Sequence, residues 1–200
     1  MEINKELLNI HLAELKFVHD QMHVRMTVVS RLIALSVTFF TFMLSSIILK
    51  FNDIFFSNYE WLLLLVIFPF FVIAMLIARE DFLMLNHDKY FFIHLRPAIL
   101  KASGVYQDSN ILMFLNGMAG CKIGAITSFA SLLRYGFPLF GMLTPGIIGF
   151  IGFSAKEHYY GLIVTFVAII TFLITLFVLY NIYRESKCVN LDNRIHQIST

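Results

Sequence analysis

Residues 161–180 read GLIVTFVAIITFLITLFVLY, a run of 20 residues without aspartate, glutamate, lysine, arginine or histidine. Four runs of 18 to 20 residues share this character: Leu32–Leu49, Trp61–Ala78, Tyr135–Phe153 and Gly161–Tyr180. A helix rises about 1.5 Å per residue, so each run covers most of a hydrocarbon layer roughly 30 Å thick. Because only a helix satisfies its own backbone hydrogen bonds in lipid, the sequence predicts an all-α membrane protein with four transmembrane helices.

The lysines and arginines between these runs are distributed unevenly. Of 15 in the chain, 13 lie in the segments 1–31, 79–134 and 181–200, and the loops 50–60 and 154–160 carry the other 2. Cytoplasmic segments are usually the lysine- and arginine-rich ones. We therefore expect both termini and the central segment to be cytoplasmic, with long helical extensions, and the two short loops to face outward. Cys121 and Cys188 would then both be cytoplasmic, where a disulfide is not expected.

The segment 1–31 has a heptad pattern. Leucine or methionine recurs every seven residues, and a second set is interleaved, which predicts a helix-packing seam of Leu8, Leu12, Leu15, His19 and Met22. Two partners are open for this seam. It packs on another cytoplasmic helix of its own chain, or it self-associates as a coiled coil.

The central segment is expected to begin as a helical continuation of the second run. Pro97 should end or bend this helix, because proline lacks an N–H donor and its ring clashes with the preceding turn. The later stretch Ile111–Leu133 carries Lys122 at its middle, which would cost about 2.5–3.5 kcal/mol at the centre of a bilayer. We expect this stretch at the membrane interface or against the cytoplasmic helices, and a re-entrant path stays open.

The third run is rich in glycine and contains two prolines. Small residues let helices approach closely in lipid, so we expect helix packing at Gly141, Gly149 and Gly152. Transporter binding sites are often formed by two helices that glycine or proline interrupts. No second run of this kind occurs in the sequence, which favours close packing over a transporter site.

Hydroxyl side chains form a stripe on the first run, at Thr38, Thr41 and Ser45. Two interpretations are open. The hydroxyls bond to backbone carbonyls or neighbouring helices, or they line a weakly selective pore in an oligomer.

The sequence lacks the residues that several classes of membrane protein need for their activity. The four runs hold no ionisable side chain, which disfavours ion-coupled transport and intramembrane proteolysis. His19 and His23 lie one turn apart, but a metal site needs further ligands, so we expect surface or seam histidines. No hydrolase, zinc or phosphate-binding motif occurs, and no basic groove for nucleic acid is indicated. We expect no enzymatic activity, cofactor, metal or direct nucleic-acid binding.

A motif in the central segment resembles a known group. It has the register A-x-x-D followed by Y-x-x-x-H-x-x-P, at Ala78, Asp81, Tyr90, His94 and Pro97. Over roughly residues 8–104 the chain resembles small, largely uncharacterised bacterial four-span proteins. It departs from them at Phe92, Ile93 and Arg96, where charged residues of other kinds are usual.

By size and layout, the chain is also similar to membrane accessory proteins of prokaryotic antiviral systems, including those that accompany RNA-targeting CRISPR nucleases. These resemblances imply a protein of the bacterial inner membrane. They favour an oligomeric pore-forming or membrane-perturbing effector or accessory subunit of a defence system. The alternative is a membrane-anchored interaction module that recruits or regulates a soluble cytoplasmic partner.

Overall fold

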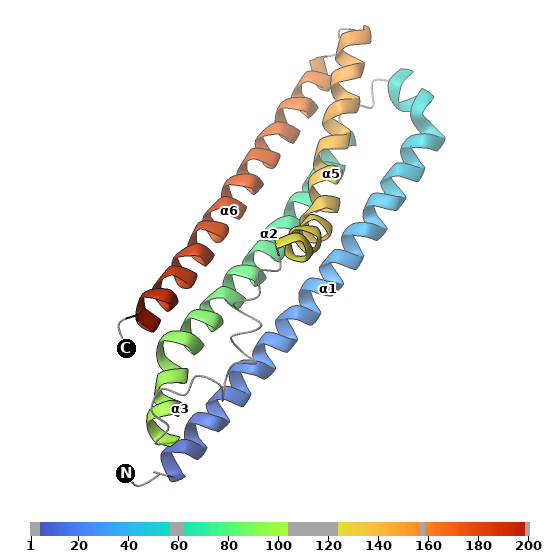
Figure 1. The fold of residues 1–200 in the computed structure, drawn as a ribbon. Coiled ribbons are helices and arrows are strands. Elements are labelled where there is room, and N and C mark those ends of the chain that lie inside the picture. Colours follow the sequence, from blue (N-terminus) through green and yellow to red (C-terminus); the bar gives the residue numbers. More distant parts are fainter. Residues whose placement is uncertain (1–4, 57–61, 104–123, 157–158, 199–200) are drawn as a thin grey trace. The chain divides into compact units, whose positions relative to one another are not determined.

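The computed structural model describes residues 5–56, 62–103, 124–156 and 159–198, and within these ranges the chain is entirely helical (Figure 1). Side chains are described over 5–47, 62–103, 134–154 and 159–186. The elements in chain order are α1 (Lys5–Phe56), α2 (Leu62–Tyr90), the π-helical turn η2 (Phe91–Leu95), α3 (Arg96–Ser103), α5 (Gly124–Lys156) and α6 (Tyr159–Ile198).

Four helical stretches among the described residues are long and apolar enough to cross a membrane: Lys5–Ile47, Leu62–Ser103, Arg134–Ser154 and Tyr159–Ser186. They contain the described parts of the four predicted runs. The prediction of an all-α chain with four long apolar helices is therefore confirmed. At most 50% of the most apolar window of each stretch is buried within the chain, so much of its apolar surface faces outward.

The chain divides into two compact units. One comprises Met1–Val28, Glu80–Ala125 and Ile182–Thr200, and the other comprises Val29–Arg79 and Ile126–Asn181. We call them the polar unit and the apolar unit. The apolar unit contains all four predicted apolar runs, and it also includes Arg31, Arg79 and Arg134, the basic residues that flank three of them.

The apolar unit has a core to which α1, α2, α5 and α6 all contribute. Its buried residues are Met43, Leu63, Ile67, Phe70, Ala74, Met142, Val164 and Ala168. Phe40 packs edge-on against two other rings, with centroid distances of 6.4 Å to Phe70 and 5.8 Å to Phe137. Aromatic edge-to-face pairs of this kind favour defined packing geometry.

The polar unit has a smaller core of its own. Val18 of α1 is buried with Phe91, Leu95 and Ile99 from η2 and α3, and four further side chains pack against them: Leu8, Leu15, Met22 and Phe92. The N-terminal part of α1 therefore packs on another helical segment of its own chain, which is the first of the two arrangements open from the sequence.

Pro97 does not end its helix. The N–H of Arg96 bonds to the carbonyl of Phe91, five residues earlier, and the helix then continues as α3 to Ser103. A π-helical turn is wider than an α-helical one, so it relieves the clash between the proline ring and the carbonyl of Ile93, four residues before it. Of the two predicted effects, termination at Pro97 was wrong.

Three helices extend into segments predicted as loops, tail or interface. Helix α1 continues to Phe56 within the predicted loop 50–60, and α6 continues to Ile198 within the predicted tail. The stretch Ile111–Leu133 is divided: residues 111–123 lie outside the described residues, and the remainder forms the start of α5.

Candidate functional site

Among the described residues of the polar unit, three side-chain contacts that join helices distant in sequence are central to its packing. The hydroxyl of Tyr90 on α2 donates to Glu14 on α1. Arg25 Nη1 on α1 donates to Glu80 Oε2 on α2 over 2.9 Å, and Lys89 Nζ on α2 donates to Glu185 Oε2 on α6 over 2.7 Å. Charge-assisted hydrogen bonds are about twice as strong as neutral ones, so these contacts favour the packing of α2 against α1 and α6 within the unit.

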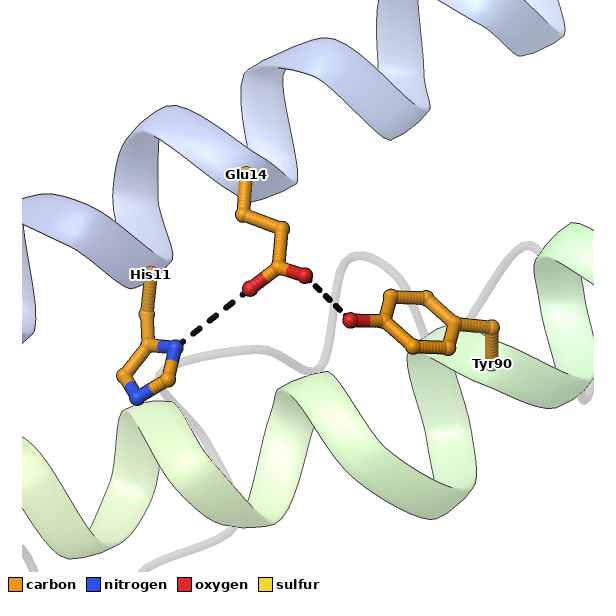
Figure 2. Close-up of polar contacts among 3 residues, drawn as sticks. All are labelled: His11, Glu14 and Tyr90. Carbon is orange, nitrogen blue, oxygen red and sulfur yellow. Dashed lines mark hydrogen bonds and ion pairs between the residues drawn. The ribbon is translucent and has the colours of Figure 1, made fainter.

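Glu14 lies at the centre of one of these contacts (Figure 2). One carboxylate oxygen accepts from Tyr90, and the other lies 3.5 Å from Nδ1 of His11, on the same helix as Glu14. The ring of His94 lies against that of Tyr90, with centroids 5.7 Å apart. The hydrogen bond with Glu14 raises the pKa of Tyr90, with smaller contributions from burial and from the Glu14 charge. Tyr90 is exposed, so this cluster is accessible from solvent.

The last turn of α2, just before Tyr90, carries two titratable groups with shifted pKa values. Burial, and secondarily the charge of Arg25, lowers the pKa of His87. Burial raises the pKa of Asp88 from 3.8 to about 6.

The third contact involves the part of α6 that follows the fourth apolar run. The hydrogen bond from Lys89, and then its charge, lowers the pKa of Glu185. Because Glu185 belongs to the polar unit, as Lys89 does, α6 contributes to the packing of that unit and not only to the apolar one.

The structure brings together part of the family-like motif. Tyr90 and His94 are in contact, whereas Asp81 is half-buried on α2 and Pro97 is exposed on α3. Glu14 and His11 complete the cluster, and sequence reasoning did not select them. In the sequence, Glu14 is a charged residue beside the heptad seam, and such residues are usually solvated. Its position in the heptad pattern does not indicate a contact with Tyr90, which lies 76 positions away.

The predicted seam is only partly buried. Leu8, Leu15 and Met22 pack against the core of the polar unit, whereas Leu12 and His19 are exposed. Self-association through these five residues stays a prediction, but three of them already have partners within the chain.

The hydroxyl stripe bonds to its own helix. Thr38, Thr41 and Ser45 donate to the carbonyls of Ala34, Val37 and Thr41, each over 2.9 Å. All three side chains are also exposed in the single chain. The backbone-bonding interpretation therefore describes these hydroxyls, and their role as pore lining stays a prediction.

The three predicted packing glycines are all buried. A Cβ at Gly141 would overlap the ring of Phe70, and one at Gly149 would lie 2.8 Å from the carbonyl oxygen of Gly161. Gly146 and Gly161 make contacts as close as these, although sequence reasoning did not select them. Gly146 lies in the glycine-rich third run, whereas Gly161 is the first residue of the fourth run.

The apolar unit also holds a groove of about 210 Å³ between α1 and α2. Its lining is apolar apart from Ser46, whose hydroxyl donates to the carbonyl of Phe42. The groove therefore offers no unsatisfied polar side chain to orient a soluble ligand. Among the residues that the structure describes, no group of three or more histidine, cysteine, aspartate or glutamate side chains is placed to hold a metal ion.

Comparisons with protein-family models, with curated proteins and with solved structures gave no match.

Proposed function

We propose that this chain is a membrane-anchored interaction module of the bacterial inner membrane, whose apolar unit lies in the bilayer and whose polar unit binds a soluble cytoplasmic partner. One observation carries the anchoring. Large apolar side chains stand outward on all four helices of the apolar unit, including Phe42, Phe68, Phe150 and Phe177, which are 71%, 67%, 58% and 67% exposed. Exposed apolar side chains on every helix of the unit would be stabilised by apolar surroundings such as the interior of a bilayer.

The polar unit supports the binding role. Its helices are joined by ion pairs and a tyrosine–carboxylate hydrogen bond, contacts that hold a defined surface in water. The cluster at Glu14 and Tyr90 leaves an exposed aromatic ring beside charged groups. Exposed aromatic side chains with a polar end are frequent at protein–protein contacts.

The orientation can be tested with engineered cysteines. In a background with Cys121→Ser and Cys188→Ser, we expect Tyr159→Cys to react with a membrane-impermeant maleimide on intact cells, because residue 159 lies in the predicted outer loop 154–160. Ser186→Cys should react only after the membrane is opened. The reverse labelling pattern would contradict the proposed orientation.

Partner binding can be tested by photocrosslinking in cells. A photoreactive residue at Tyr90 should give adducts with a soluble protein, and the same residue at Phe166, which is 62% exposed on the apolar unit, should give none. If neither position yields a protein adduct, the proposed module has no such partner.

An oligomeric pore, as in an antiviral effector, is the second candidate. It is favoured by the exposure of Thr38, Thr41 and Ser45, which several copies could turn toward a common axis. The triple variant Thr38→Val, Thr41→Val and Ser45→Ala should then reduce dye leakage while leaving membrane insertion unchanged. A wild-type protein that causes no leakage and leaves phage-infected cells unprotected contradicts both the pore and the defence role.

A further inference from the structure

Glu14 differs from the other carboxylates that join the helices of the polar unit. Each of the other two has a cation beside it, an arginine in one case and a lysine in the other. The partners of Glu14 are instead the hydroxyl of Tyr90 and the ring of His11. Among the residues that the structure describes, no lysine or arginine forms an ion pair with Glu14. The negative charge of this carboxylate is therefore available to a cation from outside the chain.

The carboxylate of Glu14 can accept further hydrogen bonds. Its side chain is 36% exposed, so a donor can reach it from solvent. A carboxylate has about four acceptor sites, and the contacts with Tyr90 and His11 use one site on each oxygen. Acceptor sites therefore remain on both oxygens, which is the arrangement that a donor with two parallel N–H groups requires.

Two aromatic rings lie beside this carboxylate. Tyr90 reaches Glu14 from α2 with its hydroxyl, which places the phenol ring next to the carboxylate (Figure 2). The ring of His94 lies against that of Tyr90, with centroids 5.7 Å apart and ring planes inclined at 40°. Tyr90 is 38% exposed and His94 is also exposed, so the rings are accessible to a ligand. The face of an aromatic ring attracts cations, so the rings and the carboxylate favour the same kind of ligand.

Exposed apolar side chains flank the cluster. On α1, Ile10 precedes Glu14 by four residues and Phe17 follows it by three, spacings that place all three on one side of the helix. Ile10 and Phe17 are each 63% exposed, and Ile93, which precedes His94 in η2, is 49% exposed. A protein that docks on these side chains would exclude water from the carboxylate between them, and an ion pair is stronger where water is excluded.

We infer that this cluster binds an arginine side chain of the soluble partner, with the guanidinium against the ring of Tyr90 and its N–H groups donating to Glu14. This role rests on the proposed function, because it specifies what the soluble partner presents to the polar unit. Arginine fits better than lysine, since its planar guanidinium stacks on aromatic rings and donates two parallel hydrogen bonds to one carboxylate. A guanidinium is also more weakly hydrated than an ammonium group, which favours it beside apolar side chains.

Binding of short peptides to the purified full-length protein tests this role. The probe is a dye-labelled, capped tripeptide of leucine, arginine and leucine, and its binding is followed by fluorescence anisotropy in an uncharged detergent. The matched control peptide carries citrulline, which has nearly the shape of arginine but no charge, and a third peptide carries lysine. Detergent micelles without protein give the background. We expect the arginine peptide to bind about fivefold more tightly than the citrulline peptide, with the lysine peptide between them.

Substitutions in the protein locate the binding. Glu14→Gln should reduce the affinity of the arginine peptide to that of the citrulline peptide, because the amide keeps the shape of the side chain and removes its charge. Glu6→Gln is the matched control, since it removes an exposed carboxylate of the same helix and should leave binding unchanged. Tyr90→Phe keeps the ring and should retain more of the preference for arginine than Tyr90→Leu, which removes it. An unchanged circular dichroism spectrum shows that each variant keeps its helical fold.

The opposite results overturn the inference. Equal affinity for the arginine and citrulline peptides, equal affinity for the arginine and lysine peptides, or arginine binding that survives Glu14→Gln each contradicts a guanidinium site at this cluster. Photocrosslinking in cells separates this failure from that of the proposed function. If a photoreactive residue at Ile93 gives an adduct with a soluble protein, its loss in Glu14→Gln supports the arginine site, and its persistence contradicts only that site. The absence of an adduct from both Ile93 and Tyr90 contradicts the proposed partner and this role with it.

Discussion

Arg25 on α1 donates to the carboxylate of Glu80 on α2 over 2.9 Å, joining two residues 55 positions apart. Their side chains are only 23% and 13% exposed, so neither charge is fully solvated. An ion pair of this kind differs from a surface pair, because removal of one partner leaves the other charge partly buried without compensation.

We expect Arg25→Gln to destabilise the polar unit by about 1–3 kcal/mol, and Glu80→Gln to have a similar effect. The reversed pair, Arg25→Glu with Glu80→Arg, should recover part of the loss because the opposite charges meet again. Thermal unfolding in a mild detergent, followed by circular dichroism, measures these differences. Lys16→Gln is the control, since Lys16 is exposed on the same helix.

The same substitution should change the titration of His87. Arg25 contributes to the lowered pKa of this histidine, although burial contributes more. Arg25→Gln should therefore raise the pKa of His87 part of the way toward 6.5, as measured by NMR of the imidazole carbons. An unchanged His87 pKa together with unchanged stability would show that the ion pair does not form in solution.

Gly149 and Gly161 lie where α5 and α6 approach closely. A Cβ at Gly149 would lie 2.8 Å from the carbonyl oxygen of Gly161, and a Cβ at Gly161 would lie 3.1 Å from the amide nitrogen of Phe153. Because backbone atoms cannot rotate away, Gly149→Ala and Gly161→Ala should each destabilise the apolar unit by about 1–3 kcal/mol.

Gly136→Ala is the matched control for these glycine variants. Its Cβ would lie 3.9 Å from the nearest atom, in the ring of Phe140, and alanine favours helix over glycine. The control should match or exceed the thermal stability of the wild type. Equal stability of all three variants would contradict the close packing of α5 on α6.

The helical class and the four apolar helices could be predicted because each run lacks charge along its whole length, a property that needs no knowledge of contacts. The heptad pattern likewise placed Leu8, Leu15 and Met22 on one face of α1. It could not identify their partner, since Leu95 and Ile99 lie more than seventy residues away and any apolar helix face would satisfy the same pattern.

The polar contacts could not be predicted for a related reason. Charged residues such as Glu14, Arg25 and Lys89 usually lie on the solvated surface of a protein. Their pairing depends on the register in which helices distant in sequence pack. The motif did direct attention to Tyr90 and His94, which are in contact, but gave no indication of Glu14. Pro97 signalled a disturbed helix, and only the structure shows that a π-helical turn accommodates it.

The hydrogen bond between Tyr90 and Glu14 should be visible in the titration of the tyrosine. Because Glu14 is the main cause of the raised pKa of Tyr90, Glu14→Gln should bring this pKa down toward 10.0. NMR of tyrosine labelled at the ζ carbon measures the change, with the signal assigned through Tyr90→Phe. Glu6→Gln, in the exposed first turn of α1, should leave the signal unchanged.

Asp88 gives a prediction for the pH dependence of stability. Burial raises its pKa from 3.8 to about 6, and among the described residues no ion pair with it compensates for this burial. An acid with a higher pKa in the folded state binds its proton more tightly there than in the unfolded chain. Stability therefore falls as pH rises from 3.8 to about 6, and the full penalty is present above that window.

Asp88→Asn removes this penalty, because the amide is uncharged at every pH while keeping nearly the same shape. The variant should be more stable than the wild type at pH 8 by about 1–2 kcal/mol, a value reduced for the partial exposure of Asp88. The difference should shrink toward zero as the pH is lowered to 4, where Asp88 in the folded wild type is protonated.

Glu185, whose pKa is lowered, has the opposite dependence, so only the difference between the two proteins isolates Asp88. Melting temperatures at pH 4, 5, 6 and 8 measure it, with Asp20→Asn as the exposed control. A difference that stays constant with pH, or an Asp88→Asn protein that is less stable at pH 8, would show that this carboxylate is not buried in the folded protein.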